Sequence, residues 1–165
     1  MRTQTVYTFR KVTPEDLGLI STWRAAPHVA RWWGNGSSYS EKDLSDSRVD
    51  RRIVCHAGRP FAFMQDYSVH GWSGHHFEWL PPGSRGIDQF VGEDEMLGSG
   101  HGTAFIGLRI SALFGDGVPI IATDPHPDNA IAIAVYRKLG FEIAGKVQSS
   151  DWGDILPMTL RPARR

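Results

Sequence analysis

The chain has 165 residues, of which 41% are hydrophobic, and its 18 basic and 18 acidic residues give a formal net charge of zero. This balance argues against nucleic acid as the main partner, because phosphate neutralisation needs a basic surplus. Cys55 is the only cysteine, no apolar stretch approaches the roughly 20 residues that cross a bilayer, and the N-terminus lacks the apolar core of a signal peptide. We therefore expect one domain over residues 1–165, cytoplasmic, with no membrane partner, as a monomer or homodimer. The histidines show no metal-ligand spacing such as H-E-x-x-H, so we expect no metal.

The N-terminal half predicts strands and short helices. Alternation over 5–12 predicts a strand, and Thr13-Pro14 begins a helix, because threonine can cap and proline suits the first helical position. The next elements are a short helix at 27–33 closed by Gly34, a loop at 34–40, a short helix near 41–45, and strands at 49–57 and 60–69 joined as a hairpin at 57–59. Residues 70–83 are rich in glycine, proline and aromatic residues and predict a long loop, which inside a compact domain is often functional.

The C-terminal half predicts alternating strands and helices. In order these are a strand at 84–92, a helix at 100–115, a strand at 118–123, a helix from Asp128 or Asn129 to Leu139 followed by Gly140, and strands at 141–148 and 154–161. In the 100–115 helix, one apolar stripe holds Phe105, Leu108 and Ala112, and the next holds Ile106, Ile110 and Leu113.

A glycine-rich segment, Leu97–Thr103, precedes the 100–115 helix. Alternate glycines at 98, 100 and 102 remove side chains where a ligand must approach the backbone. The start of the helix also directs free N–H groups at whatever lies there, which suits a phosphate. By itself the segment could equally be a flexible connection between a strand and a helix.

Asn129 and Tyr136 are separated by about two helical turns, so both project from one face of the predicted helix, roughly 10 Å apart along its axis. The run from Tyr136 to Phe141 marks a helix that stops at Gly140 before a strand opening with an aromatic residue. A helix cap, a half-buried tyrosine and an ordinary helix stop would explain these residues without any function.

Taken together, the motifs resemble the GNAT acetyltransferase superfamily. They combine a strand, a G-x-G helix start, an apolar strand, an Asn-capped helix and a Y-x-K-x-G-F run. Four further runs are similar to the aminoglycoside 6'-N-acetyltransferases: His28–Gly34, Gly86–Gln89, Gly98–Thr103 and Thr123–Asn129. One departure is Leu97, where the superfamily commonly has Gln or Arg.

The resemblance implies an α/β (α+β) GNAT fold: a mixed, mostly antiparallel sheet of about seven strands, flanked by helices and splayed at strands 84–92 and 118–123. It implies acetyl-CoA as cosubstrate, with the pantetheine arm bonded to the backbone near Phe90 and Val91 and contacted by Asn129. The diphosphate would bind the amides of Gly98, Ser99, Gly100, His101, Gly102 and Thr103.

The resemblance also implies direct attack of an amine on the thioester. Tyr136 would be the general acid for the leaving thiolate, and a backbone N–H near Phe90 or Val91 would stabilise the oxyanion. Asp88 is the candidate base, although it could instead only anchor the acceptor or pair with Arg85. Acceptor contacts are expected from Trp32, Trp33, Gln65, Asp66, Tyr67, Asp88, Asp124 and Asp151.

The expected reaction is therefore acetyl transfer to a primary amine of a small molecule, with the 6'-amine of an aminoglycoside as first choice. The alternatives are a GNAT enzyme for another small amine or hydroxylamine of the siderophore-precursor type, and a non-catalytic GNAT-fold binding protein. An acidic acceptor pocket would favour the polycation, and an arginine-lined pocket would favour an amino-acid-like acceptor.

Overall fold

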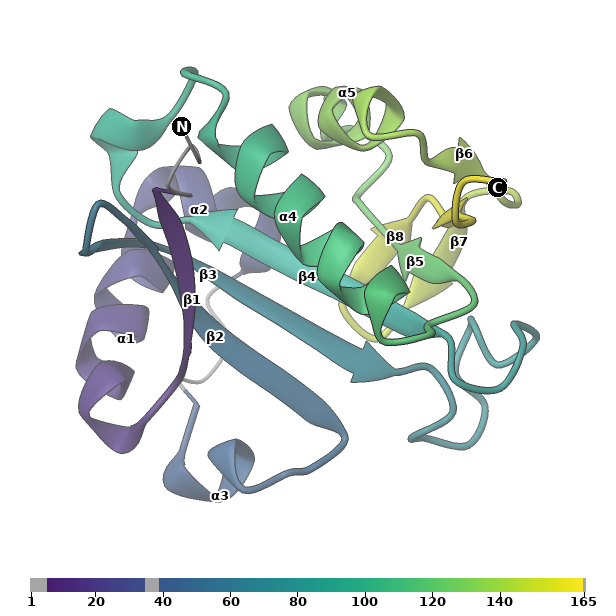
Figure 1. The fold of residues 1–165 in the computed structure, drawn as a ribbon, viewed down its shortest axis with the longest axis horizontal. Helices are drawn as coiled ribbons and strands as arrows, with labels where there is room; N and C mark the ends of the chain where they lie inside the picture. Colours follow the sequence, from purple (N-terminus) through teal and green to yellow (C-terminus); the bar gives the residue numbers. More distant parts are fainter. Residues whose placement is uncertain (1–5, 35–38, 165) are drawn as a thin grey trace. The chain divides into compact units, whose positions relative to one another are not determined.

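The computed structural model describes residues 6–34 and 39–164 (Figure 1). By its internal contacts the chain divides into two compact units, Met1–Asp66 with Asp88–His101, and Tyr67–Ile87 with Gly102–Arg165. We call these the first and the second unit. The single domain expected over 1–165 stays a prediction.

The elements follow the predicted order closely. They are β1 (Tyr7–Lys11), η1 (Pro14–Asp16), α1 (Leu17–Ala25), α2 (Pro27–Trp33), α3 (Glu41–Leu44), β2 (Val49–His56), β3 (Arg59–Ser68), β4 (Arg85–Val91), η2 (Asp94–Met96), α4 (His101–Gly115), β5 (Ile121–Thr123), α5 (Ala130–Lys138), β6 (Glu142–Ile143), β7 (Gln148–Ser150), β8 (Gly153–Ile155) and β9 (Met158–Leu160). One seven-stranded sheet has the order β1-β2-β3-β4-β5-β9-β6, and β7 pairs only with β8. The expected mixed seven-stranded fold is confirmed. The loop predicted at 34–40 falls mostly on 35–38, outside the described residues.

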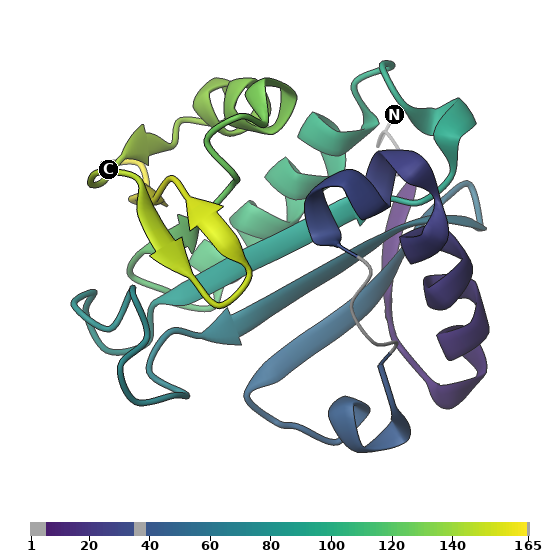
Figure 2. The same ribbon diagram turned by 180° about the vertical axis from the view of Figure 1, so that it is seen from behind.

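The first unit packs helices α1 and α2 on one face of its strands. Figure 2 shows both helices on the viewer's side of these strands. The buried contacts come from Ile20 and Trp23 of α1, Val29 of α2, and Phe63 and Phe90 of β3 and β4. Burying such large aromatic and aliphatic groups is the main favourable term that fixes the helices on the strands.

The start of the first helical segment is held by a buried carboxylate. Asp16 accepts two hydrogen bonds from the Arg10 guanidinium, each 2.7 Å, and one from the Thr13 backbone N–H at 2.9 Å. The Thr13 N–H bond belongs to a capping box between Thr13 and Asp16, at the position where Thr13 was predicted to cap. The Arg10 hydrogen bonds lower the pKa of Asp16, against the opposing effect of burial.

The β2–β3 hairpin turns at Ala57 and Gly58, with φ of 48° and 83°. Positive φ at both central residues matches the right-handed twist of the flanking strands. The predicted hairpin is therefore confirmed, and Gly58 supplies one of the two left-handed positions without a steric penalty.

In the second unit, the parallel ladder between β4 and β5 pairs Arg85 with Ile121 and Gly86 with Ala122. Beyond it β4 runs on to Val91, whereas β5 ends at Thr123. The strand predicted at 118–123 is thus shorter than expected. β5 continues the sheet on its other side as an antiparallel partner of β9.

Helix α4 buries one of its two predicted apolar stripes. Ile106, Ile110 and Leu113 are buried together with Phe105, whereas Leu108 is exposed, as is Ala112. Of the stripe that the sequence pattern assigned to Phe105, Leu108 and Ala112, only Phe105 is buried. A single helix face of about 100° suffices to cover the unit's core, so the second stripe stays in solvent.

The C-terminal segment differs most from the prediction. Instead of strands over 141–148 and 154–161, it forms β6, the β7–β8 hairpin and β9. Pro157 explains the break between β8 and β9, because it has no N–H for a ladder and its carbonyl instead accepts from Ala144 N at 2.9 Å. The short η2 helix was not predicted.

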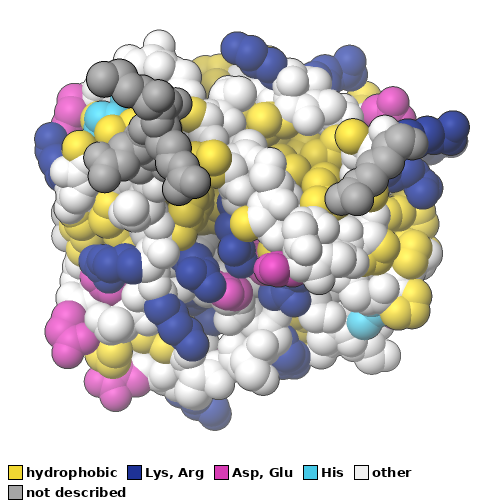
Figure 3. Space-filling view, in the orientation of Figure 1, with side chains coloured by type: hydrophobic (Ala, Val, Ile, Leu, Met, Phe, Trp, Pro, Cys, Tyr) yellow, Lys and Arg dark blue, Asp and Glu magenta, His cyan; other side chains and the backbone are white. Residues whose placement is uncertain are grey.

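Charges of both signs and apolar side chains are mixed on the face shown in Figure 3. Over residues 6–34 and 39–164, none of the helices is long and apolar enough to span a bilayer.

Candidate active site

Asp88 belongs to a polar cluster on the first unit. It projects from β4 and accepts a hydrogen bond from the Gln65 side-chain amide of β3, with Nε2 to Oδ2 at 3.0 Å. The Gln65 carbonyl oxygen in turn accepts from the Tyr39 hydroxyl at 3.5 Å. The structure therefore brings together two predicted site residues, Gln65 and Asp88, and adds Tyr39, which the sequence did not indicate.

Two guanidinium groups lie close to the Tyr39 ring. Arg24 lies 5.5 Å and Arg51 4.8 Å from its centroid, and the other neighbour is Phe63, stacked at 5.7 Å. Burial raises the pKa of the Tyr39 hydroxyl, and the nearby Asp88 charge acts in the same direction, against the arginines. Tyr39 is therefore a neutral hydrogen-bond donor at pH 7.

The two predicted tryptophans have different surroundings. Trp33 packs edge-on against Phe63 and Phe90, with ring centroids 6.1 and 5.0 Å apart, and so lies partly buried against the hydrophobic core of the first unit. Trp32 is half-buried and carries the Arg31 guanidinium 4.8 Å above its ring. Of the two, Trp32 is therefore the better placed to meet a ligand.

Asp66 lies on the opposite face of β3 from Gln65 and Tyr67, because successive strand residues alternate. Only 2% of Asp66 is exposed. The hydrogen bond to Asp50 raises the pKa of Arg52 on β2, and the Asp66 charge acts in the same direction. The three consecutive residues predicted as one acceptor surface thus do not share a face.

The end of β4 is anchored by His28. Its Nε2 lies 2.8 Å from the Val91 carbonyl oxygen. The Phe90 side chain is buried, stacked on Phe63 at 5.3 Å, so Phe90 can act on a ligand only through its backbone. The sequence placed His28 in a family-like run but did not indicate this anchoring contact.

The segment predicted to bind phosphate is exposed at residues 98–100 and offers a ligand mainly backbone groups. Gly98 and Gly100 have φ of 73° and 82°, and a Cβ added at either would meet nothing within 4 Å. Such left-handed residues before a helix turn successive amides toward one point, which suits an anion. Ser99 is exposed, and α4 begins at His101 and continues through Gly102 and Thr103.

His101 is the half-buried end of this segment in the first unit. Its Nδ1 lies 2.6 Å from the Tyr7 hydroxyl of β1, and its ring is 4.9 Å from His56 and 5.6 Å from Phe61. The His101 side chain therefore links the segment to three strands.

In the second unit, Asn129 and Tyr136 lie at the two ends of α5. The Asn129 carbonyl oxygen caps the helix by accepting from Ala132 N at 3.2 Å, as its cap role predicted. Tyr136 is only 6% exposed and packs edge-on against Phe141, with ring centroids 5.3 Å apart. The helix ends at Lys138 with Leu139 as its C-cap, and Gly140 follows with a φ of 103°. Asn129 therefore caps the helix, and Tyr136 packs against the aromatic residue that follows it. The cap uses the side-chain oxygen of Asn129.

Asp124, directly after β5, is paired with a histidine of the 70–83 loop. His76 Nε2 lies 2.8 Å from Asp124 Oδ2. Tyr67, another predicted acceptor residue, is buried against Gly86, where an added Cβ would lie 2.2 Å from the tyrosine ring. Asp151 is exposed in the β7–β8 turn.

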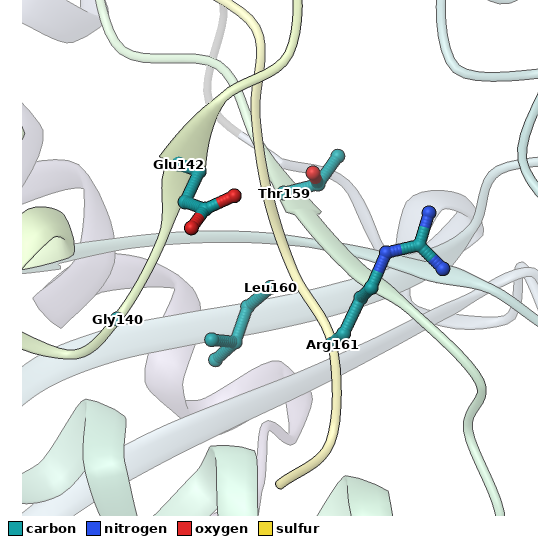
Figure 4. Close-up of a pocket in the computed structure, with 5 residues that line it drawn as sticks. All are labelled: Gly140, Glu142, Thr159, Leu160 and Arg161. Carbon is teal, nitrogen blue, oxygen red and sulfur yellow. The ribbon is translucent and has the colours of Figure 1, made fainter. Parts of the chain in front are cut away.

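One shallow hollow of about 190 Å³ in the second unit is lined by Gly140, Glu142, Thr159, Leu160 and Arg161 (Figure 4). None of these residues was predicted for the site, and Glu142 and Arg161 are exposed. We assign it no chemistry. Among the residues that the structure describes, no group of three or more His, Cys, Asp or Glu side chains could hold a metal ion.

Comparison with known proteins agrees with this arrangement. Residues 13–149 match the family described as Acetyltransferase (GNAT) domain. The chain is 33% identical to an aminoglycoside N(6')-acetyltransferase type 1 of Klebsiella pneumoniae over 168 residues, covering 94% of this chain and 84% of that protein. It is also 41% identical to a kanamycin resistance protein of Rhizobium radiobacter, over 52% of this chain and 81% of the relative.

A crystal structure of the aminoglycoside acetyltransferase AAC(6')-Ib in complex with coenzyme A and kanamycin is similar throughout. Its TM-score is 0.84 at 32% identity, and 94% of each chain is covered. The chain therefore belongs to the GNAT acetyltransferase family. Within that family it is an acetyl-CoA-dependent N-acetyltransferase that acts on a small-molecule amine.

Proposed function

We propose that this chain transfers the acetyl group of acetyl-CoA to the 6'-amine of an aminoglycoside. The observation that carries the proposal is the 33% identity to an aminoglycoside N(6')-acetyltransferase over 94% of the chain. Two carboxylates support it from the structure, Asp88 bonded to Gln65 and Asp124 bonded to His76. A polycationic acceptor needs such groups, because each can make a charge-assisted hydrogen bond to an ammonium.

The residues ahead of α4 suit the diphosphate of acetyl-CoA. The exposed backbone at Gly98 and Gly100 has open space where side chains would stand. We propose that the amides of Gly98 to Thr103 hold the diphosphate, and that the Phe90–Val91 backbone and the Asn129 amide hold the pantetheine arm. Bound there, acetyl-CoA supplies a thioester carbonyl carbon as the electrophile.

Asp88 is proposed as the general base. An alkyl ammonium must lose a proton before its nitrogen can attack, and a carboxylate can take that proton directly or through water. The Gln65 amide donates to one oxygen of Asp88 and so fixes the orientation of the carboxylate. Gln65 is therefore proposed as a positioning residue.

Tyr136 is proposed as the general acid. When the tetrahedral adduct collapses, the departing thiolate sulfur needs a proton, which a tyrosine hydroxyl can donate. Packing against Phe141 holds the Tyr136 ring in place. A backbone N–H near Phe90 or Val91 would stabilise the oxyanion that precedes collapse.

For the acceptor we propose Trp32, Asp88, Asp124 and Asp151 as contacts, with Gln65 acting through Asp88. Trp33, Asp66 and Tyr67 are proposed to shape the site from buried positions rather than by direct contact, since each is at least partly buried against its neighbours.

One observation favours a second acceptor class. Arg24 and Arg51 both lie close to the ring of Tyr39, which is linked through Gln65 to Asp88. Guanidinium groups in that position would attract an amine that also carries a carboxylate.

A panel of amines measured by thiol release tests the proposal. It contains kanamycin, a linear polyamine and an amino acid, each assayed with the wild-type chain and with Asp88→Asn. The proposal expects the highest kcat/KM for kanamycin, loss of that activity in the variant, and acetylation at the 6' position by NMR of the product. A preference for the amino acid would instead support the arginine-lined site. Turnover of none of these amines would contradict both assignments.

The cellular setting completes the proposal. We propose a cytoplasmic monomer or homodimer without a nucleic-acid or membrane partner, as the balanced charge and the single cysteine indicate. Size-exclusion chromatography with light scattering distinguishes the two assembly states.

A further inference from the structure

His76 and Asp124 form a hydrogen-bonded pair of little-exposed side chains in the second unit. Their hydrogen bond is 2.8 Å long, and the two side chains are only 13% and 8% exposed. His76 comes from the 70–83 loop, and Asp124 follows β5. The loop that the sequence singled out as long and functional therefore reaches the carboxylate expected to bind the acceptor.

The surroundings hold the imidazole in place. His75 stacks on His76 at 4.2 Å, Phe77 lies 4.5 Å away, and the Trp152 ring stands edge-on at 6.0 Å. Trp152 itself is 65% exposed, so the pair borders solvent at the turn of the β7–β8 hairpin. A ligand arriving from solvent can thus meet an aromatic ring and this pair together.

The ionisable groups near His76 come from three elements. The loop contributes His70, His75 and Glu78, the segment after β5 contributes Asp124, and the β7–β8 hairpin carries Asp151 and Asp154. Burial lowers the pKa of His75 to about 4, and the neighbouring His76 acts in the same direction. His75 is therefore neutral near pH 7, and it adds no competing positive charge there.

We propose that His76 is a specificity-determining residue that sets, through its own protonation, how much negative charge Asp124 offers to a cationic acceptor. This inference rests on the proposed aminoglycoside function. With a neutral imidazole, the pair carries the full negative charge of the carboxylate and binds an ammonium. With an imidazolium, the pair is neutral overall, and the ammonium must displace a cation already bonded to Asp124.

Histidine suits this role because its charge changes between about pH 5 and 8. Nearby carboxylate favours the charged imidazolium, and a bound ammonium opposes it, so acceptor binding and proton release are coupled. Acceptor affinity should consequently rise as pH increases through the titration of His76. At still higher pH the acceptor amines lose their own charge, and the affinity falls again.

The test compares His76→Gln with the wild-type chain, using kanamycin and acetyl-CoA from pH 5.5 to 8. Glutamine can still donate a hydrogen bond to Asp124 but cannot carry a charge. We expect the variant to have a KM for kanamycin at pH 5.5 lower by about tenfold, the factor equivalent to ~1.4 kcal/mol. Its KM should also lose most of the pH dependence of the wild type. His70→Gln is the matched control, because His70 lies on the same loop and bonds the Glu78 carbonyl rather than Asp124.

The outcomes separate the inference from the proposed function. If the wild type turns over kanamycin and His76→Gln shows the same pH dependence of KM as the wild type, the inference is wrong and the proposed function stands. Loss of kcat at every pH with an unchanged KM also overturns the inference, because His76 would then be the base. Absence of kanamycin turnover by the wild type overturns the proposed function and the inference with it.

A second measurement uses the wild-type chain and so tests the proposal even if the variant does not fold. The imidazole signals of the wild-type chain, assigned by NMR, are followed in a pH titration with and without kanamycin. We expect kanamycin to shift the midpoint of His76 to lower pH and to leave His70 unchanged. An unchanged His76 midpoint with kanamycin bound overturns the proposal.

Discussion

The Gln65 amide donates to the Asp88 carboxylate across neighbouring strands, at 3.0 Å. This bond gives the proposed base a fixed orientation, so the two residues make different predictions. Asp88→Asn keeps the shape of the side chain but removes the group that accepts a proton. Gln65→Ala keeps the base but removes the group that orients it.

For Asp88→Asn we expect kcat/KM for the acceptor to fall by about 10²-fold or more, the usual contribution of a general base. For Gln65→Ala we expect a fall of about tenfold, because a hydrogen bond to a charged group contributes ~1.5–3 kcal/mol and water can replace part of it. Steady-state kinetics measure both, with Asp50→Asn on β2 as a carboxylate control that should retain full activity. A larger loss in Gln65→Ala than in Asp88→Asn would reverse the assigned roles.

Tyr136→Phe should lower kcat by about 10²-fold with little change in acetyl-CoA affinity. The ring stays packed on Phe141, so only the hydroxyl that donates the proton is removed. Pre-steady-state or steady-state kinetics give kcat, and calorimetric titration gives the affinity. Unchanged turnover in a folded variant removes Tyr136 from the acid role.

Helices and strands were predictable wherever capping and turn residues in the sequence mark both of their ends. Pro27 and Gly34 bracket α2, so its bounds were predicted to the residue. The β7–β8 hairpin was missed because Gln148–Ser150 has no apolar alternation. It is held instead by a turn in which Gly153 has a φ of 108° and Ser150 Oγ donates to its carbonyl at 2.7 Å. Such a turn leaves little trace in hydrophobic periodicity.

The site was predictable only in part, for a related reason. Asp88 could be identified because it lies in a family-like run on a central strand. Its partner Gln65 could be grouped with it only loosely, since strand register is not visible in the sequence. The His76–Asp124 pair joins residues 48 positions apart, and neither residue alone indicates the other. Pairings of this kind are set by the tertiary structure of a long loop.

The pH dependence of stability should include Asp16. Its pKa is lowered by the Arg10 hydrogen bonds, so its contribution to folding is present above the unfolded value of 3.8 and is lost as pH falls through the lower folded value. We expect Asp16→Asn to reduce the free energy of unfolding at pH 7 by about 2 kcal/mol, the scale of hydrogen bonds to a charged group. Urea denaturation at pH 7 and near pH 2.5 measures the effect.

Toward the lower pH the wild type and Asp16→Asn should converge, because the wild-type carboxyl takes up a proton as pH falls through its lowered folded pKa. Asp46→Asn is the control, since that carboxylate pairs with Arg48 in an exposed turn and screening weakens such pairs. If Asp16→Asn stays equally destabilised at both pH values, the loss comes from packing rather than from the ion pair.

Gly100→Val tests the phosphate segment, with Gly117→Val as its matched control. The two glycines have φ of 82° and 90°, and at both an added Cβ would meet nothing within 4 Å. Valine should therefore cost each variant about 1–2 kcal/mol of backbone strain, so their melting temperatures should fall together. Only Gly100 lies just before α4, whereas Gly117 follows its C-terminal end.

Acetyl-CoA at 1,000 times its Kd should stabilise the wild type and Gly117→Val by about 4 kcal/mol, and Gly100→Val far less, because the side chain obstructs the approach to the amides. Equal stabilisation of the two variants in a thermal-shift assay would show that the diphosphate binds elsewhere.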